Sequence, residues 1–423
     1  MANSAVAVKK DLYTRHTFHA FTNHSYIRLW LANFLLYTAR WMQMTLLIWL
    51  VLELTDSPWQ VALVGFFSSV PMFVLGLVGG VLADGGHRQR LLTSTQLGNV
   101  GVSVLLVILL SSGVVEVWHA YLTSLVSGVC WALDTPTRRA VIFDLLGLEG
   151  VTNAMALDSV GMNASRMCGP ALAGVLITLV GISGGYLVVT VFYALQLVLL
   201  WSLRLPTATR QMRRQQSIGR NLLEGLRYVV TNRLLLATIC ITVAMNMLLF
   251  PYVQMVPIIA RDVLRVDPFL MGMLQAAEGC GALVGAILIA ASVNIRYHGR
   301  IFIGGSLLAL LTLLGFSISP WYIVSFPMLL FLGFGTAGFG AMQSTLTVLA
   351  AQPDMRGRAL GVVSLAIGTG PLGSLLMGAM ASAVHPVFAI RMNALLGIIA
   401  LAVIALVLPM IMDRTQPVRA ATP

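Results

Sequence analysis

The chain has 423 residues, of which 58% are hydrophobic and only 10% are charged. Soluble domains carry roughly 25% charged residues, so this composition excludes a soluble globular protein. The formal net charge of +11 is explained by basic loops that meet anionic lipid headgroups, and it requires no nucleic-acid partner. The composition therefore predicts an integral membrane protein.

Apolar runs recur along almost the whole chain, each long enough to cross about 30 Å of hydrocarbon as a helix. We count about twelve and expect an all-α membrane protein with twelve transmembrane helices. The predicted spans are Ile27–Leu52, Pro58–Ala83, Leu91–Gly113, Trp118–Ala140, Ala154–Val180, Tyr186–Leu203, Leu234–Ala260, Leu270–Val293, Ile301–Ser319, Trp321–Leu346, Ala359–Val384 and Val387–Met412.

One long polar segment, residues 204–233, divides these spans into two groups of six. It predicts a cytoplasmic linker between two six-helix bundles, and the spacing of Glu224, Arg227 and Tyr228 favours a short amphipathic helix there over a solvated loop. The N-terminal stretch is polar and lacks the features of a secretory signal, so we expect a cytoplasmic tail. The predicted units are a tail at 1–26, bundles at 27–203 and 234–412, and a tail at 413–423.

The basic residues predict the orientation. With both termini in the cytoplasm, only Arg261, Arg265 and Arg391 fall outside, and Arg40 and Arg166 fall within spans. All other Lys and Arg residues then lie on the cytoplasmic side, which is a strong positive-inside signal. We therefore expect both termini in the cytoplasm.

A charged, glycine-rich turn at Gly79–Arg90 lies between the second and third spans. Charged side chains are costly in hydrocarbon, so this turn marks a water-facing helix end. It resembles the loop between the second and third helices of the major facilitator superfamily, with Gly80, Asp84 and Arg88 at matching positions. The departures from the family pattern are Gly85 and His87.

Further segments resemble the branch of that superfamily that contains the enterobactin exporter and related efflux permeases. The resemblance covers nearly the whole chain and implies two bundles related by a pseudo-two-fold axis, rocking about a site near the bilayer midplane. It implies a monomeric transporter of a bacterial inner membrane, not an enzyme. The matching segments are Trp49–Pro58, Asp134–Arg138, Asn153–Ser159, Arg166 with Gly169–Gly174, Phe250–Tyr252, Ala260–Val263 and Arg356–Arg358.

Motifs for ATP hydrolysis and metal binding are missing from the sequence. It contains no Gly-x-x-x-x-Gly-Lys-Ser/Thr segment, which argues against a primary pump. The histidines show no metal-ligand spacing, and the four cysteines fall in separate spans. The 21 methionines suit an adaptable apolar pocket better than a soft-metal site. We expect no cofactor and no metal.

Three charged residues fall deep inside predicted spans. At about 1.5 Å per helical residue, Arg40 and Arg166 lie roughly 20 Å from the inner face, and Glu278 lies roughly 12 Å from the outer face. These depths bring them to a similar level. The resemblance implies that the fifth and eighth helices face each other across the two halves, so an Arg166–Glu278 pair is geometrically plausible. Unpaired charges are expensive there, which makes all three functional candidates. Glu278 is either the proton carrier or one partner of a structural ion pair.

Another group of charges lies nearer the inner face. Asp158 could exchange protons, or it could bind Arg138 or Arg139 as an inner gate, and the nearby arginines favour the gate. Asp134 and Arg138 are also expected to act as a gate or latch. The Gly169–Pro170 pair permits a kink or a close helix approach. The full predicted gating set is Gly80, Asp84, Arg88, Asp134, Arg138, Gly169 and Pro170.

The predicted substrate site is amphipathic. Two arginines against one glutamate at mid-depth favour an anionic substrate, with aromatic and amide contacts from other side chains. The candidate substrate-binding residues are Arg40, Arg166, Trp41, Asn246, Phe250, Gln254 and Gln343.

The favoured function is proton-coupled export of amphipathic small molecules, siderophore or drug-like, by alternating access. The expected partners are the substrate, protons through Glu278 and Asp158, and membrane lipids. The alternatives are an importer or facilitator of an organic anion, a lipid flippase, or a non-transporting membrane sensor or scaffold.

Overall fold

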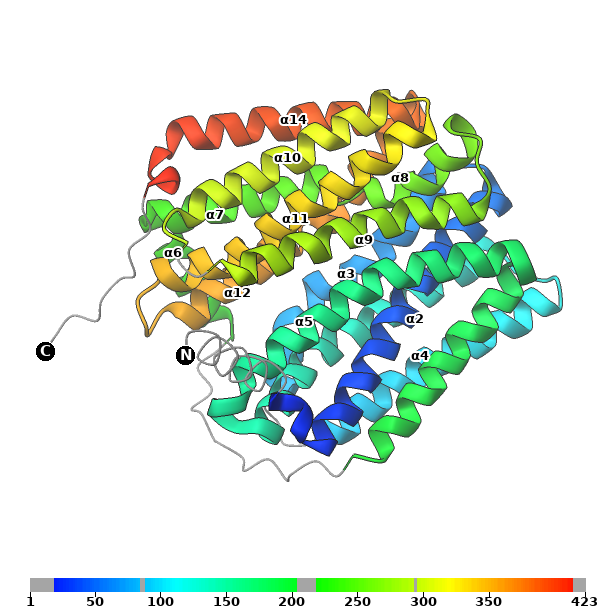
Figure 1. The fold of residues 1–423 in the computed structure, drawn as a ribbon, viewed down its shortest axis with the longest axis horizontal. Coiled ribbons are helices and arrows are strands. Elements are labelled where there is room, and N and C mark those ends of the chain that lie inside the picture. Colours follow the sequence, from blue (N-terminus) through cyan, green and yellow to red (C-terminus); the bar gives the residue numbers. More distant parts are fainter. Residues whose placement is uncertain (1–18, 84–87, 204–217, 293–294, 414–423) are drawn as a thin grey trace, which may run out of the picture.

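The computed structural model describes residues 19–83, 88–203, 218–292 and 295–413. These residues form long helices that run side by side, with the N-terminal helices on one side of the molecule and the C-terminal helices on the other (Figure 1). Asp84, one of the predicted gating residues, lies outside the described residues.

Capping by a polar side chain marks the start of the first long N-terminal helix. The Asn23 side chain caps the first long helix by accepting hydrogen bonds from the backbone N–H groups of Ser25 and Tyr26. The elements are η1 (His19–Thr22), α2 (His24–Thr55), α3 (Pro58–Ala83), α4 (Arg88–Ser111) and α5 (Val117–Trp201).

The element α5 contains the predicted fourth, fifth and sixth spans. It is interrupted at Gly147 (φ 64°) and Gly181 (φ 72°), where only glycine adopts a positive φ without steric cost. Residues 38–43 of α2 hydrogen-bond to Ser127, Ser165 and Tyr193, one from each segment of α5. The three segments therefore fold back beside one another.

The C-terminal helices include two segments that the apolar runs predicted as continuous. The predicted seventh span contains two π-helical turns and a bend at Phe250–Pro251, and the eleventh is broken at Gly368–Thr369. Proline lacks a backbone N–H, and π turns often mark irregular sites in helices. The elements are α7 (Arg233–Ala244), η2 (Met245–Leu249), α8 (Tyr252–Ile258), η3 (Ile259–Val263), α9 (Pro268–Ala291), α10 (His298–Ile318), α11 (Tyr322–Ala350), α12 (Arg356–Ile367), α13 (Gly370–Ala383), α14 (Pro386–Val407) and η4 (Pro409–Met412).

The expected helix in the linker is present as α6 (Ile218–Thr231). It packs against α7 and α12, and Glu224 forms an ion pair with Arg358 of α12 at 3.2 Å. The Tyr228 hydroxyl accepts a hydrogen bond from the backbone N–H of Gln352. These contacts attach the second half of the linker to the C-terminal helices.

Ten helices in the described ranges are long and apolar enough to cross a membrane. One of them, Gly150–Trp201, is 52 residues long and contains the break at Gly181. The exact number of twelve spans and the cytoplasmic position of both termini stay predictions.

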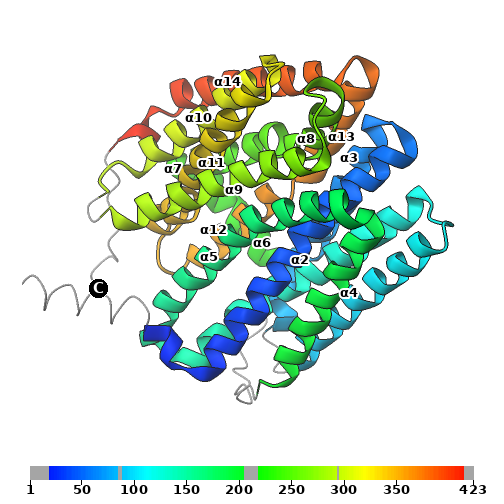
Figure 2. The ribbon, with the colours of Figure 1, turned by 45° about the vertical axis from the view of Figure 1, so that its right-hand side comes forward.

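The two groups of helices meet along two seams, α5 against α9 and α3 against α13 (Figure 2). At the end of the molecule where α2 joins α3, Arg261 binds the Asp56 carboxylate. We call this the closed end, and the opposite end, near α6 and α12, the linker end.

Near the closed end, a Cβ on Gly272 of α9 would lie 2.5 Å from the Pro170 carbonyl oxygen. Glycine therefore permits very close packing of α5 on α9.

Candidate functional site

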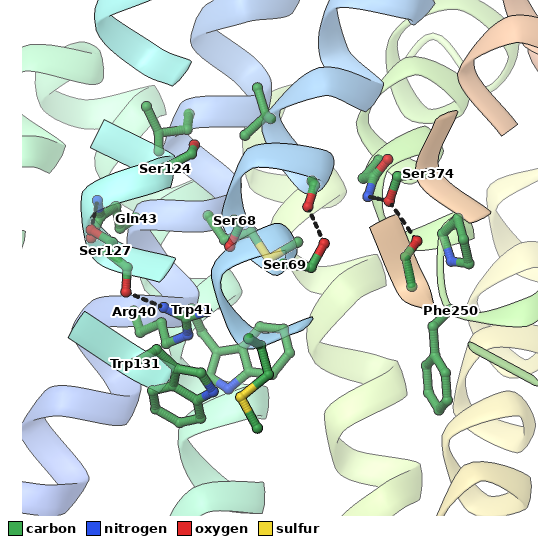
Figure 3. Close-up of a pocket in the computed structure, with 18 of the residues that line it drawn as sticks. Arg40, Trp41, Gln43, Ser68, Ser69, Ser124, Ser127, Trp131, Phe250 and Ser374 are labelled. Atoms are coloured by element: carbon green, nitrogen blue, oxygen red, sulfur yellow. Dashed lines mark hydrogen bonds between the residues drawn. The ribbon is translucent and has the colours of Figure 1, made fainter. Parts of the chain in front are cut away.

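A cavity of about 310 Å³ lies between the two groups of helices. Arg40 and Trp131 line one side of it, and Phe250 and Ser374 line the other (Figure 3). Most of the remaining lining is apolar or consists of small hydroxyl side chains, such as Ser68. A concave, mainly apolar space with a few fixed polar groups is typical of a small-molecule site.

Arg40 is the main positive charge that lines this cavity. Its guanidinium lies over the Trp131 ring, 4.4 Å from the centroid, and its Nη1 donates to the Ser127 carbonyl oxygen at 3.3 Å. Among the described residues, the ion pairs do not include Arg40. The side chain is therefore held in place by an aromatic ring and a carbonyl group, with its charge available to an anion.

The predicted Arg166–Glu278 pair is present. Arg166 of α5 donates through Nη2 to Oε1 of Glu278 on α9, and only 5% of Glu278 is exposed. The Arg166 guanidinium also lies 5.4 Å from the centroid of the Trp41 ring, and its Nε is buried without a hydrogen-bond partner. Trp41 lines both the large cavity and a smaller one beside the pair. The pair thus joins the two groups of helices next to the large cavity.

A second ion pair, Arg138 with Asp134, is buried among the N-terminal helices, with 2% of each side chain exposed. Asp134 also accepts hydrogen bonds from Thr95 and Gln96, each at 3.0 Å. Removing one partner of such a pair leaves an uncompensated charge.

Among the described residues, the ion pairs do not include the predicted contact of Asp158 with Arg138 or Arg139. For Asp158 and Arg138, the structure shows the reason. Asn33 of α2 lies between them: its Oδ1 accepts from Arg138, and its Nδ2 donates to Asp158 at 2.6 Å. The Tyr37 hydroxyl donates to the other Asp158 oxygen at 3.1 Å. The charges interact through an amide because α2 packs between them, and the network belongs to the N-terminal helices alone.

The buried pair leads to a first prediction. Replacing Asp134 with Ala should lower the free energy of unfolding by about 3–5 kcal/mol, because Arg138 loses its buried counter-ion. Replacing Asp56 with Ala should cost less than about 1 kcal/mol, because 78% of its side chain is exposed. Thermal melting of the purified variants in detergent checks both, and similar melting temperatures for the two would contradict the assignment.

The predicted amide and aromatic contacts divide into two classes. Asn246, Phe250 and Gln254 line the large cavity, as expected. Gln343 does not: its Nε2 donates to the Thr242 hydroxyl at 2.9 Å, which fixes α11 against α7. In this structure its amide therefore serves a contact between helices, and its role as a substrate ligand stays a prediction.

Gly169 allows a close helix approach. A Cβ at this position would lie 2.6 Å from Trp41 Cβ, while α5 keeps helical φ and ψ here, since its breaks are at Gly147 and Gly181. Pro170 lines the small cavity. After the turn between the second and third spans, Arg88 of α4 forms an ion pair with Asp144 of α5. This arginine therefore connects α4 to α5.

Several residues that line the cavity could not be selected from the sequence. Ser127 and Trp131 hold Arg40, and Ser374 accepts a hydrogen bond from Gln254 at 2.8 Å. A tryptophan or serine in an apolar span is common, so only their position beside Arg40 and Gln254 identifies them. Within the described ranges, no cluster of His, Cys, Asp and Glu could hold a metal ion.

Comparison with known proteins decides the family. Residues 15–420 match the family model described as transmembrane secretion effector. The chain belongs to this family of the major facilitator superfamily. It is a secondary transporter with a small-molecule substrate and a multi-pass protein of a bacterial inner membrane, and the predicted superfamily and branch are confirmed.

Individual relatives agree with this assignment. The chain is 24% identical over 365 residues to the staphyloferrin A transporter of Staphylococcus aureus, covering 82% of this chain and 87% of the relative. It is 25% identical over 338 residues to the enterobactin exporter of Shigella flexneri, covering 79% of each chain.

Solved structures show the same fold. An inward-facing, occupied bacterial homologue of the human lysosomal transporter Spinster superposes with a TM-score of 0.69 at 15% identity, covering 91% of this chain and 96% of that one. A peptide transporter in complex with sulfate gives a TM-score of 0.74 at 12% identity, covering 92% and 94%.

Proposed function

We propose that this family member exports amphipathic small molecules bearing an anionic group, in exchange for protons. The two bundles, residues 27–203 and 234–412, rock about the cavity by alternating access. One observation carries the proposal: the Arg166–Glu278 pair is buried where α5 meets α9, beside a cavity that Arg40 lines. A carboxylate in this position can link a proton to the contact between the bundles.

The pair acts as a lock on the empty, deprotonated transporter. It helps to hold α5 against α9, so the closed end stays closed. A substrate anion that binds Arg166 breaks the pair, and so does a proton that neutralises Glu278. Substrate alone or a proton alone breaks the ion pair and allows the bundles to move. With neither bound, the ion pair stays intact and the bundles do not move. Because the bundles move only with substrate or a proton bound, substrate leaves in one direction and a proton returns in the other.

The cavity indicates the class of substrate. Arg40 in the large cavity and Arg166 in the small one beside it each lie over an indole ring, so a planar anion can meet a guanidinium and an aromatic face together. A volume of about 310 Å³ is at the lower end of the range for drug-sized ligands. The relatives named for staphyloferrin A and enterobactin support a siderophore or a siderophore-like anion.

Arg40 provides a test of the anion site. Replacing Arg40 with Ala should weaken binding of a carboxylate siderophore about ten- to hundredfold, the value of one charged hydrogen bond. The neutral methyl ester should bind equally to both proteins. The matched control is Arg28→Ala, which removes an exposed arginine that donates to the Ser202 carbonyl oxygen. Calorimetry on the three purified proteins measures all six affinities, and equal losses for acid and ester in Arg40→Ala would contradict an anion site.

Transport into inside-out vesicles tests the function itself. The panel comprises carboxylate, catecholate and hydroxamate siderophores, simple organic anions and lipophilic cations. We expect accumulation of amphipathic anions when the vesicle interior is acidic, and its collapse when a protonophore is added. Accumulation of lipophilic cations alone would overturn the substrate class, and transport unaffected by the protonophore would overturn proton coupling.

A further inference from the structure

A separate cavity of about 280 Å³ lies among α9, α10 and α11. It does not share a lining residue with the cavity around Arg40. Leu288 of α9, Leu308 of α10 and Phe334 of α11 give it an apolar wall. Leu288 is 53% exposed, so this groove opens on the outer surface of the C-terminal helices.

Glycines create the groove by drawing α11 close to both neighbours. A Cβ on Gly285 of α9 would lie 2.7 Å from Ala337 Cβ, and a Cβ on Gly305 of α10 would lie 2.7 Å from the Gly335 carbonyl oxygen. α11 runs between α9 and α10 (Figure 1) and forms part of the groove wall with both of them. Gly304 faces open space, with no atom within 4 Å of its would-be Cβ.

Basic side chains lie where the groove reaches the linker end. Ile295 and Ile301 both line the groove, and the exposed Arg296 and Arg300 are their immediate chain neighbours. The Arg300 guanidinium lies 4.1 Å from the centroid of the Tyr297 ring, and its Nε donates to the Met412 carbonyl oxygen. The sequence has no Asp or Glu between Glu278 and Asp354, and Glu278 of α9 is paired with Arg166, so acidic side chains of α9–α11 do not oppose these arginines. Outside these helices, the exposed Asp413 directly follows Met412 in the chain.

We propose that this groove binds an anionic phospholipid. One acyl chain lies between α9 and α10, and the phosphate is held by Arg296 and Arg300. In a membrane, an apolar hollow on the protein surface faces hydrocarbon, and arginines at its mouth select negative headgroups. The site is distinct from the transport cavity in both its helices and its lining.

Native mass spectrometry of the full-length protein tests this site. The protein is released from bilayers that contain equal amounts of phosphatidylglycerol and phosphatidylethanolamine. We expect one phosphatidylglycerol to be retained in preference. Each of Arg296→Gln and Arg300→Gln should reduce this preference about fivefold. Gly304→Leu, whose side chain fills the hollow, should remove the retained lipid.

Two matched variants complete the experiment. Gly340→Leu adds the same side chain at a position on α11 that also faces open space but does not line the groove. Arg265→Gln removes one positive charge between η3 and α9, near the closed end. Both should retain phosphatidylglycerol like the unmodified protein. Equal retention in Gly304→Leu, or an unchanged lipid preference in both Arg296→Gln and Arg300→Gln, would overturn the proposal.

Discussion

Replacing Glu278 with Gln is expected to abolish substrate accumulation driven by a proton gradient, while exchange of labelled for unlabelled substrate continues. Glutamine is similar in size but cannot carry a proton, and it does not form an ion pair with Arg166. The lock is therefore weakened permanently, and the cavity around Arg40 is left intact. The substrate concentration inside the vesicles should rise only to that outside, and exchange should stay within about threefold of the unmodified rate.

The matched control is Glu116→Gln. Glu116 is the exposed N-cap residue of α5 and does not line either cavity beside Trp41. This variant should accumulate substrate normally. If Glu278→Gln accumulated substrate as well as the control did, Glu278 would be a structural ion-pair partner and not the proton carrier.

Replacing Gly272 with Ala is expected to force the closed end apart. Its Cβ would lie 2.5 Å from the Pro170 carbonyl oxygen and 2.9 Å from Gly174 Cα, and backbone atoms cannot rotate away. Overpacking of this kind costs about 1–3 kcal/mol. The closed population should therefore fall about fivefold to more than a hundredfold, and transport should slow accordingly.

Spin labels at Leu179 of α5 and Phe269 of α9, on a cysteine-free background, measure this change. Both side chains are exposed, by 73% and 40%. We expect a longer distance distribution in Gly272→Ala than in the unmodified protein. Gly340→Ala, at a position with open space around it, should leave the distribution unchanged. An unchanged distribution in Gly272→Ala would show that the α5–α9 seam can accept a methyl group.

The ends of a helix and the depth of a residue along it could be predicted from the sequence, because they depend on that helix alone. The fifth span was expected to end at Val180, and α5 breaks at Gly181. The pairing of Arg166 with Glu278 could be predicted from their similar depth, because the helical rise per residue is nearly constant, together with the facing fifth and eighth helices that the family resemblance implies. Composition and the length of the apolar runs were sufficient for the membrane assignment.

Features that depend on the rotation of a helix or on a distant residue could not be predicted. Gln343 has a suitable depth, but its side chain faces Thr242 and not the cavity. Asn33 lies between Asp158 and Arg138, yet it is 125 residues from Asp158 along the chain. The bend at Phe250–Pro251 within the seventh span also has no signature in hydropathy.

Proton movement during substrate uptake tests the central claim most directly. Inside-out vesicles containing the purified transporter and a pH-sensitive dye receive a carboxylate siderophore, with no gradient imposed. The account predicts that protons leave the vesicles as substrate enters, and that Glu278→Gln shows no such signal. Protons entering together with the substrate, or substrate entry without any proton movement, would contradict it.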